Sequence, residues 1–155
     1  MGEQLANTIE GVKCNSITKV SDPRGDLFHV VKETELLRNI KEIYCSSIYR
    51  NEIKAWKKHL KMTQYLVVPV GTVKFILYDD RENSSTYKRI DELIIGEQQY
   101  SRLIIPPNIW YGFQSKSMYT SLIINTPDLA YDPNETERLP LDQTHIPYRW
   151  TINDD

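Results

Sequence analysis

Short segments of strand-forming residues, separated by turn residues, recur along the chain from Lys41 onward. The segments, rich in β-branched, aromatic and other apolar side chains, are residues 43–49, 65–70, 73–78, 94–95, 100–105 and 120–124. The turn signals between them are Gly71-Thr72, Asp79-Asp80, Glu82-Asn83-Ser84-Ser85, Gly96 and Pro106-Pro107-Asn108. Many short strands with such punctuation predict an all-β fold, and small barrels of this kind hold one ligand among inward-facing side chains.

Segment 73–78 alternates as a strand with two different faces does. The residues expected to share one face are Val73, Phe75 and Leu77. Only Gly71-Thr72 separates this segment from segment 65–70, and connections this short are typical of hairpins. We therefore expect the two segments to pair with each other.

The expected organisation is one domain with one short helix. The chain has 155 residues without a repeat, a low-complexity tract or a linker, so a single cupin-like domain is expected over residues 1–155. The helix is expected near residues 32–40, where Thr34 can cap a first turn that contains Glu35.

Charge and cysteine content limit the classes of partner and compartment. The formal net charge is -2 without a dominant basic stripe, which argues against a nucleic-acid partner. Cys14 and Cys45 form no CxxC pair, so free, buried thiols in a reducing compartment are expected. Residues 1–7 lack the basic and apolar run of a signal peptide, and no apolar stretch approaches the roughly 18 residues of a membrane span. We therefore expect a cytoplasmic protein with no membrane partner.

Five motifs carry the polar side chains at which chemistry is expected. In chain order they are Asp22-Pro-Arg24-Gly25-Asp-Leu-Phe28, Trp56-Lys-Lys-His59, Val70-Gly71 through Asp80-Arg81, Leu103-Ile-Ile-Pro106 through Tyr111-Gly112-Phe113, and Tyr131-Asp-Pro133 through Glu137. Their order suggests a small β-barrel whose cavity receives an arginine, a histidine and several tyrosines, and which fits an anionic, ring-bearing small molecule. Four lysines lie near the histidine in the sequence, and these are Lys54, Lys57, Lys58 and Lys61. They either lie on a strand face exposed to solvent or attract a phosphate group.

Taken in this order, the motifs resemble those of the dTDP-4-dehydrorhamnose 3,5-epimerases and their relatives, from about residue 17 to residue 150. The resemblance implies a cupin-type jelly-roll barrel with a short N-terminal helix. It also implies a nucleotide-sugar substrate, no cofactor, and a homodimer that exchanges strands. Because a fold does not transmit function, the functional argument depends on the site residues.

In that family a histidine removes the proton beside a 4-keto group, a basic residue steadies the enolate, and a tyrosine returns a proton to the opposite face. The resemblance implies that His59 is the base, a role that suits imidazole because it titrates near neutral pH. It implies that Arg24 binds phosphate through charge-assisted hydrogen bonds. Tyr131, in the segment that continues to Glu137, is implied to stack on the nucleotide base.

Two basic positions of the family are occupied by other residues. The family's phosphate-facing arginine corresponds to Trp56, with Lys57 or Lys58 as substitutes. The lysine that steadies the enolate corresponds to Gln64. We expect Gln64, Asn125 or a nearby lysine to donate to the developing oxyanion.

The acid and the carboxylate that orients the histidine are also replaced. The family's catalytic tyrosine corresponds to Asn125, and an amide cannot donate a proton as a phenol with a pKa near ~10 can. We expect Tyr65 or Tyr111 to supply the acid. The chain ends at Asp155, before the carboxylate that usually orients the histidine. The candidates for that orienting role are Asp79, Asp80 and Glu52.

The sequence therefore predicts a sugar-nucleotide epimerase or isomerase acting next to the carbonyl of a nucleotide-linked 4-keto-6-deoxyhexose, by a single epimerisation or a keto shift. Two alternatives stay open. In the first, the protein binds sugar nucleotides without turnover, because Gln64 and Asn125 stand where the family has catalytic residues. In the second it is a metal-dependent cupin, which needs about three ligands. Because His59-Leu60-Lys61 supplies one ligand, no metal is expected.

Overall fold

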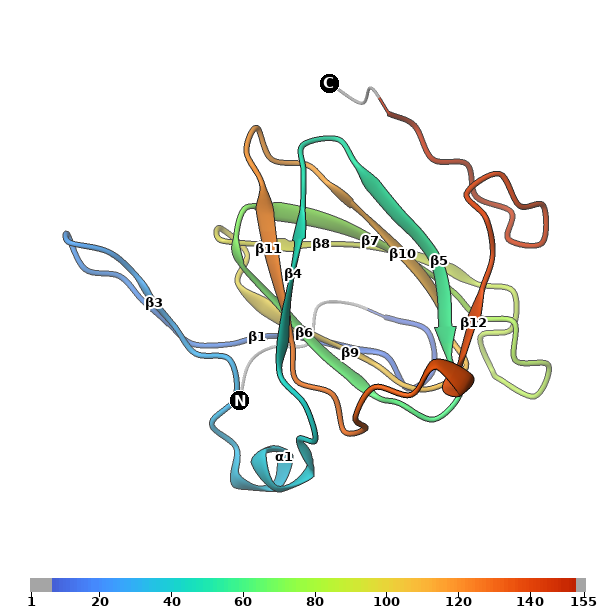
Figure 1. Cartoon of the computed structure of the whole chain (residues 1–155), viewed down its shortest axis with the longest axis horizontal. Helices are drawn as coiled ribbons and strands as arrows, with labels where there is room; N and C mark the ends of the chain where they lie inside the picture. Colours follow the sequence, from blue (N-terminus) through green and yellow to red (C-terminus); the bar gives the residue numbers. More distant parts are fainter. Residues whose placement is uncertain (1–6, 153–155) are drawn as a thin grey trace.

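The computed structural model describes residues 7–152, and its strands form two sheets that face each other (Figure 1). The first five-stranded sheet contains, in spatial order, β1 (Lys13–Ser16), β9 (Ser101–Ile105), β6 (Gln64–Val70), β11 (Ser121–Asn125) and β4 (Tyr44–Ile48). The second five-stranded sheet contains β12 (Thr136–Arg138), β5 (Ile53–His59), β10 (Trp110–Ser115), β7 (Thr72–Tyr78) and β8 (Ile90–Gly96). Neighbouring strands are antiparallel in both sheets, so the all-β prediction is confirmed.

Strand pairing within residues 7–152 leaves the two sheets separate and does not close them into a barrel. The chain crosses between the sheets at Gly71, because β6 pairs with β9 and β11 while β7 pairs with β10 and β8. The predicted hairpin between segments 65–70 and 73–78 is therefore wrong. Gly71 has a φ of +85°, and a Cβ there would lie 2.2 Å from Ser121 Oγ. The turn is thus packed against β11, in a conformation that glycine adopts without strain.

The N-terminal part adds a small hairpin and a helix. β2 (Lys19–Val20) pairs with β3 (Leu27–Phe28), and this hairpin projects away from both sheets (Figure 1). Helix α1 (Thr34–Asn39) lies where the sequence predicts one, but its N-cap residue is Glu33. The predicted cap at Thr34 is therefore wrong. Glu33 makes no capping hydrogen bond, and its carboxylate accepts one at 2.9 Å from the guanidinium of Arg102.

The alternation predicted for segment 73–78 is confirmed, and both faces of the strand are buried. Val73, Phe75 and Leu77 belong to the core between the sheets. Ile76 and Tyr78 belong to a second core cluster, which the C-terminal segment covers with Ile146 and with the partly buried Leu139, Tyr148 and Trp150. The outer face of the second sheet is thus covered by the C-terminal segment.

Several predictions concern the ends of the chain or its thiols. Both thiols are free, as the sequence predicts. Cys14 is buried as expected, but Cys45 is exposed on the edge strand β4, so the prediction that it is buried is wrong. No helix within residues 7–152 is long and apolar enough to cross a membrane. The prediction that the N-terminus carries no signal peptide concerns mainly residues 1–6, and the prediction about the chain end concerns Asp155. Residues 1–6 and 153–155 lie outside the described part of the chain.

Candidate active site

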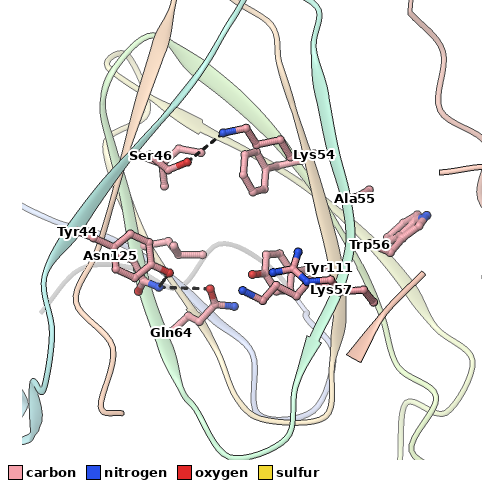
Figure 2. A pocket seen from close by; sticks show the side chains of 13 residues that line it. Tyr44, Ser46, Lys54, Ala55, Trp56, Lys57, Gln64, Tyr111 and Asn125 are labelled. Carbon is pink, nitrogen blue, oxygen red and sulfur yellow. Dashed lines mark hydrogen bonds between the residues drawn. The ribbon is translucent and has the colours of Figure 1, made fainter. Parts of the chain in front are cut away.

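A cavity of about 340 Å³ lies between the two sheets (Figure 2). Tyr44, Gln64 and Asn125 approach it from the first sheet, while Lys57 and Tyr111 approach it from the second. Its apolar lining comes from both sheets and consists of Leu66, Phe113 and Ile123. A second cavity of about 280 Å³ shares two lining residues, Tyr44 and Lys57, with the first. The other residues that line the second cavity are Glu42, His59, Met62, Tyr131, Glu135 and Thr136.

A bulge in β5 decides which of its side chains face the cavities. Lys57 pairs with Tyr111 and Ala55 pairs with Gly112, so Trp56 is an extra residue between two successive pairs. Lys57 therefore shares the inward face with His59 two residues later. The Trp56 ring packs outside, against Tyr148 and Trp150 at centroid distances of 6.1 and 5.4 Å, and Figure 2 shows it pointing away from the cavity.

His59, at the end of β5, is held by a buried carboxylate. Its Nδ1 is hydrogen-bonded to Glu135 Oε1, and the residue is only 4% exposed. The other carboxylate oxygen, Glu135 Oε2, accepts hydrogen bonds from the backbone amides of Lys61 and Met62 at 3.1 and 3.2 Å. Glu135 ends the short helix η1 (Pro133–Glu135), which the pairing of β12 with β5 brings to the histidine.

The protonation states of this pair follow from its surroundings. Burial lowers the pKa of His59, and Glu135 opposes that shift without reversing it. Burial raises the pKa of Glu135, but the hydrogen bonds from His59, Lys61 and Met62 outweigh burial and lower it. At neutral pH Glu135 is therefore a carboxylate that accepts the Nδ1 proton of a neutral His59, which leaves Nε2 able to take a proton. Tyr111 lies beside that nitrogen, with its Oη at 3.4 Å and its ring stacked on the imidazole.

On the first sheet, Asn125 organises a row of polar groups. Its Oδ1 accepts the backbone N–H of Tyr65 at 3.1 Å, which fixes the orientation of a side chain amide that is 0% exposed. Its Nδ2 must then face the other way, and it donates to Tyr44 Oη at 2.8 Å and to Gln64 Oε1 at 3.3 Å. The phenol oxygen of Tyr44 therefore accepts a hydrogen bond from this amide.

The larger cavity is lined by cations. Lys54, Lys57 and Arg138 line it, and no carboxylate within residues 7–152 does. Lys58 instead lies on the outer face, where its Nζ is 3.1 Å from Glu137 and 3.6 Å from Asp80. A cavity with this charge favours an anionic ligand.

The structure brings most of the predicted site residues together but not all. His59, Tyr131, Lys57, Gln64, Asn125 and Tyr111 line one or both cavities. Tyr65 lines neither cavity, and Glu137 pairs with Lys58 outside them. Arg24 lies in the turn of the projecting β2–β3 hairpin, where its side chain is 90% exposed and paired with Asp22. The sequence predicts that His59, Tyr131 and Arg24 border one cavity. Within one chain, Tyr131 does lie at the same cavity as His59, and Arg24 does not.

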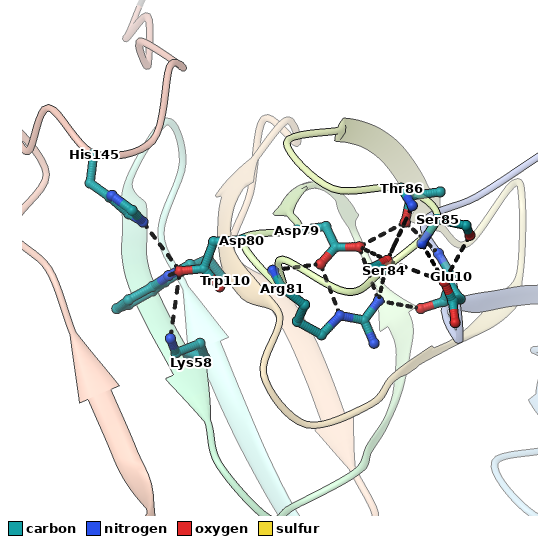
Figure 3. Close-up of polar contacts among 10 residues, drawn as sticks. All are labelled: Glu10, Lys58, Asp79, Asp80, Arg81, Ser84, Ser85, Thr86, Trp110 and His145. Carbon is teal, nitrogen blue, oxygen red and sulfur yellow. Dashed lines mark hydrogen bonds and ion pairs between the residues drawn. The ribbon is translucent and has the colours of Figure 1, made fainter.

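The sequence offered Asp79, Asp80 and Glu52 as the carboxylate that orients His59. This prediction is wrong, because Glu135 makes that hydrogen bond. Figure 3 shows the contacts of two of the candidates outside the cavities. Asp79 accepts from Arg81 Nε at 2.8 Å and from Ser84 Oγ at 2.6 Å. Asp80 accepts from Trp110 Nε1 at 2.7 Å and lies 3.2 Å from His145 Nε2. The third candidate, Glu52, is exposed in the turn between β4 and β5.

Sequence reasoning assigned no role to three residues of the site, which are Tyr44, Glu135 and Arg138, whereas Lys54 is one of the four lysines that it offered for phosphate. A local signal exists for Glu135, since Asp132-Pro133 is typical of a capped helical turn and Asp132 does cap η1. The contact itself spans 76 residues, so no local pattern indicates it. Within residues 7–152 no group of three or more His, Cys, Asp or Glu side chains comes together as a metal site.

The fold and the site together define a two-sheet protein with a buried histidine–carboxylate pair beside a cavity lined by cations. The family model for dTDP-4-dehydrorhamnose 3,5-epimerase matches residues 6–155. The probable low-salt glycan biosynthesis epimerase Agl13 of Haloferax volcanii is 34% identical over 148 residues, covering 92% of this chain and 94% of that protein. The spore coat polysaccharide biosynthesis protein SpsL of Bacillus subtilis is 31% identical over 145 residues, covering 92% and 96%. The crystal structure of a dTDP sugar isomerase from Desulfovibrio desulfuricans shares 34% identity and a TM-score of 0.87, with 92% of each chain covered.

The chain therefore belongs to the dTDP-4-dehydrorhamnose 3,5-epimerase family. Its activity is that of a sugar-nucleotide epimerase.

Proposed function

We propose that the protein epimerises a nucleotide-linked 4-keto-6-deoxyhexose with His59 as the general base. The observation that carries this proposal is the buried pair in which Glu135 accepts the Nδ1 proton of His59. A histidine held in this tautomer presents a basic Nε2, and the lowered pKa keeps it unprotonated at neutral pH. Removal of the proton beside the 4-keto group then converts the sugar ring carbon into a planar enolate.

The enolate oxygen requires a donor on the cavity wall, and we assign Lys57 to this role. Lys57 lines both cavities and shares the inward face of β5 with His59. A cation placed where negative charge develops stabilises the transition state more than the ground state. Gln64, which is buried beside Asn125, supplies a second polar group on the opposite wall.

The remaining cations and the exposed tyrosine suit the nucleotide diphosphate. Lys54 and Arg138 line the larger cavity and are placed to bind phosphate oxygens. Tyr131 is 71% exposed at the smaller cavity, and its backbone N–H donates to Glu42 Oε2 at 2.9 Å. An exposed ring held in this way can stack on a nucleotide base.

The nucleotide specificity is tested by a thermal-shift panel of dTDP, UDP, GDP and CDP sugars. Binding to the folded state raises the melting temperature, so dTDP sugars are expected to give the largest shift. The same protein, mixed with a dTDP-4-keto-6-deoxyhexose and followed by NMR, is expected to form the epimer. If only a sugar of another nucleotide stabilises the protein, that nucleotide sugar is the substrate class. If no keto sugar in the panel is converted to its epimer, the proposal is contradicted.

We also propose that the protein works as a cytoplasmic homodimer of single-domain chains. The support is that Arg24, expected at the phosphate, lies on a hairpin that projects from its own chain. A second copy related by a two-fold axis can receive this hairpin at its cavity. In that arrangement the Arg24 guanidinium breaks its exposed pair with Asp22 to bind the diphosphate.

Complementation between two impaired variants, assayed at a substrate concentration below the KM of Arg24→Ala, tests this arrangement. Arg24→Ala is expected to raise KM, and His59→Asn to abolish turnover. If Arg24 serves the partner's cavity, co-expression of the two variants restores about a quarter of wild-type activity, because random pairing puts one intact site into half of the dimers. A mixture no more active than Arg24→Ala alone would show that Arg24 acts within its own chain or not at all.

A further inference from the structure

We propose that Tyr44 is the acid that returns the proton to the substrate carbon, on the face opposite His59. This assignment rests on the epimerase function proposed above and goes beyond it by naming the second proton-transfer group. Three tyrosines line the cavities, and Tyr44 lines both of them. The sequence singled out only the other two, Tyr111 and Tyr131.

Inversion at carbon requires the base and the acid to stand on opposite sides of a planar enolate. His59 belongs to β5 of the second sheet, and Tyr44 belongs to β4 of the first sheet. The cavity lies between these walls, and Figure 2 shows Tyr44 across it from Lys57 and Tyr111, which belong to the second sheet together with His59. An enolate bound between the sheets therefore exposes one face to His59 and the other to Tyr44.

The hydrogen bonds of Tyr44 leave its proton available for transfer. Asn125 lies directly opposite Tyr44 in the register of β11 and β4, and its Nδ2 donates to the phenol oxygen at 2.8 Å. Since Asn125 Oδ1 is already committed to the backbone N–H of Tyr65, the amide offers Tyr44 a donor and no acceptor. The phenol proton is thus directed away from Asn125, and Tyr44, which is 37% exposed, lines both cavities.

The charge around Tyr44 keeps that proton in place until a substrate arrives. Burial is the main cause that raises the pKa of Tyr44; the Asn125 hydrogen bond lowers it by less, and the negative charges of Glu42 and Glu135 add to the rise. At neutral pH the phenol is therefore protonated and can act as an acid.

The other two candidate phenols are less well placed. Tyr65 follows the inward-facing Gln64 in β6, so its side chain points to the other face of the sheet, and it lines neither cavity. Tyr111 belongs to the same sheet as His59, and its ring stacks on the imidazole at a centroid distance of 6.0 Å. A proton from Tyr111 would therefore reach the substrate on the side of the base, without inversion.

The proton balance of the step is simple. His59 Nε2 takes the proton from the carbon beside the carbonyl, whose bonding electrons become the enolate. The enolate carbon then takes the proton from Tyr44 Oη, which restores the 4-keto group and leaves a phenolate. Solvent removes the proton from the imidazolium and returns one to the phenolate, so the protein is unchanged after one turnover.

Exchange and inversion measured together in D2O test the assignment. Tyr44→Phe is expected to lower epimer formation by about 10²–10⁴-fold, the usual contribution of a general acid. Deuterium uptake into the unreacted keto sugar should continue, because His59 still removes the proton and returns deuterium to the same face. Asn125→Asp is expected to show the same uncoupling, because a carboxylate accepts the Tyr44 proton instead of directing it to the substrate. The matched control is Tyr49→Phe, at a residue that is 69% exposed and lines neither cavity.

Other outcomes overturn the proposal. Epimer formation by Tyr44→Phe at the wild-type rate would remove Tyr44 from the mechanism. Uncoupling of exchange from inversion in Tyr65→Phe or Tyr111→Phe, with none in Tyr44→Phe, would assign the acid to that residue. Absence of both exchange and inversion in the wild-type protein would instead contradict the epimerase function itself, so the two failures are distinguishable.

Discussion

Glu135→Gln lowers the turnover number for epimerisation by about 10²–10⁴-fold while the protein stays folded, as expected when a carboxylate that orients a catalytic histidine is lost. The carboxylate accepts the Nδ1 proton of His59 and so keeps Nε2 unprotonated. A glutamine amide can present its N–H₂ to Nδ1, which then becomes the acceptor and moves the proton to Nε2. A histidine in that tautomer cannot take a proton from the substrate.

The pH profile separates this positioning role from a purely structural one. In the wild-type protein kcat/KM is expected to rise as His59 loses its proton, with a midpoint below the ordinary histidine value because burial lowers the pKa of His59. Glu135 opposes that shift, so removing its charge lowers the pKa of His59 further. The rising limb should therefore move to lower pH in Glu135→Gln, together with the lower plateau.

The matched control is Glu52→Gln, at the exposed carboxylate that the sequence offered for the same role. It should leave both the rate and the pH profile unchanged. A Glu135→Gln variant with wild-type turnover, or one whose loss of activity leaves the midpoint in place, would contradict the assignment of Glu135 as the positioning residue.

His59→Asn should have the other very large effect, a loss of at least about 10²–10⁴-fold in turnover with substrate binding retained. Asparagine keeps a polar side chain near Glu135 but offers no basic nitrogen. The nucleotide shift in melting temperature should stay close to the wild-type value, because the cations that line the larger cavity are untouched.

His145→Asn is the matched control for this substitution. His145 lies on the outer face beside Asp80, and its side chain is 53% exposed. Its replacement should leave epimerisation unchanged. Turnover by His59→Asn within a few-fold of the wild type, or equal losses in both histidine variants, would remove His59 from the role of base.

Local patterns predicted those parts of the fold that depend on neighbouring residues. The alternation of Val73, Phe75 and Leu77 was sufficient to identify β7 and its inner face. The pairing of β7 with β8 and β10 was not predicted, since a short turn at Gly71 is compatible both with a hairpin and with a crossing between sheets. The outcome depends on the packing of Gly71 against Ser121, which lies far away in the sequence.

The same distinction applies to the site. His59 and Lys57 were identified because they stand in one motif, two residues apart on a strand. Tyr44 was missed because β4 carries none of the five motifs. Glu135 lies inside the fifth motif, but only the pairing of β12 with β5 brings it to His59. Asn125 illustrates the limit most clearly. The resemblance implies that Asn125 stands at the position of the family's tyrosine, but only the structure shows a phenol on the neighbouring strand, hydrogen-bonded to that amide.

Solvent deuterium uptake into a dTDP-4-keto-6-deoxyhexose, followed by NMR, tests most directly whether this cavity moves protons on carbon. Wild-type protein is expected to label the carbon beside the carbonyl and to form the epimer, and His59→Asn is expected to do neither, although it still binds the nucleotide. Labelling by His59→Asn that proceeds at the wild-type rate would contradict the account at its centre.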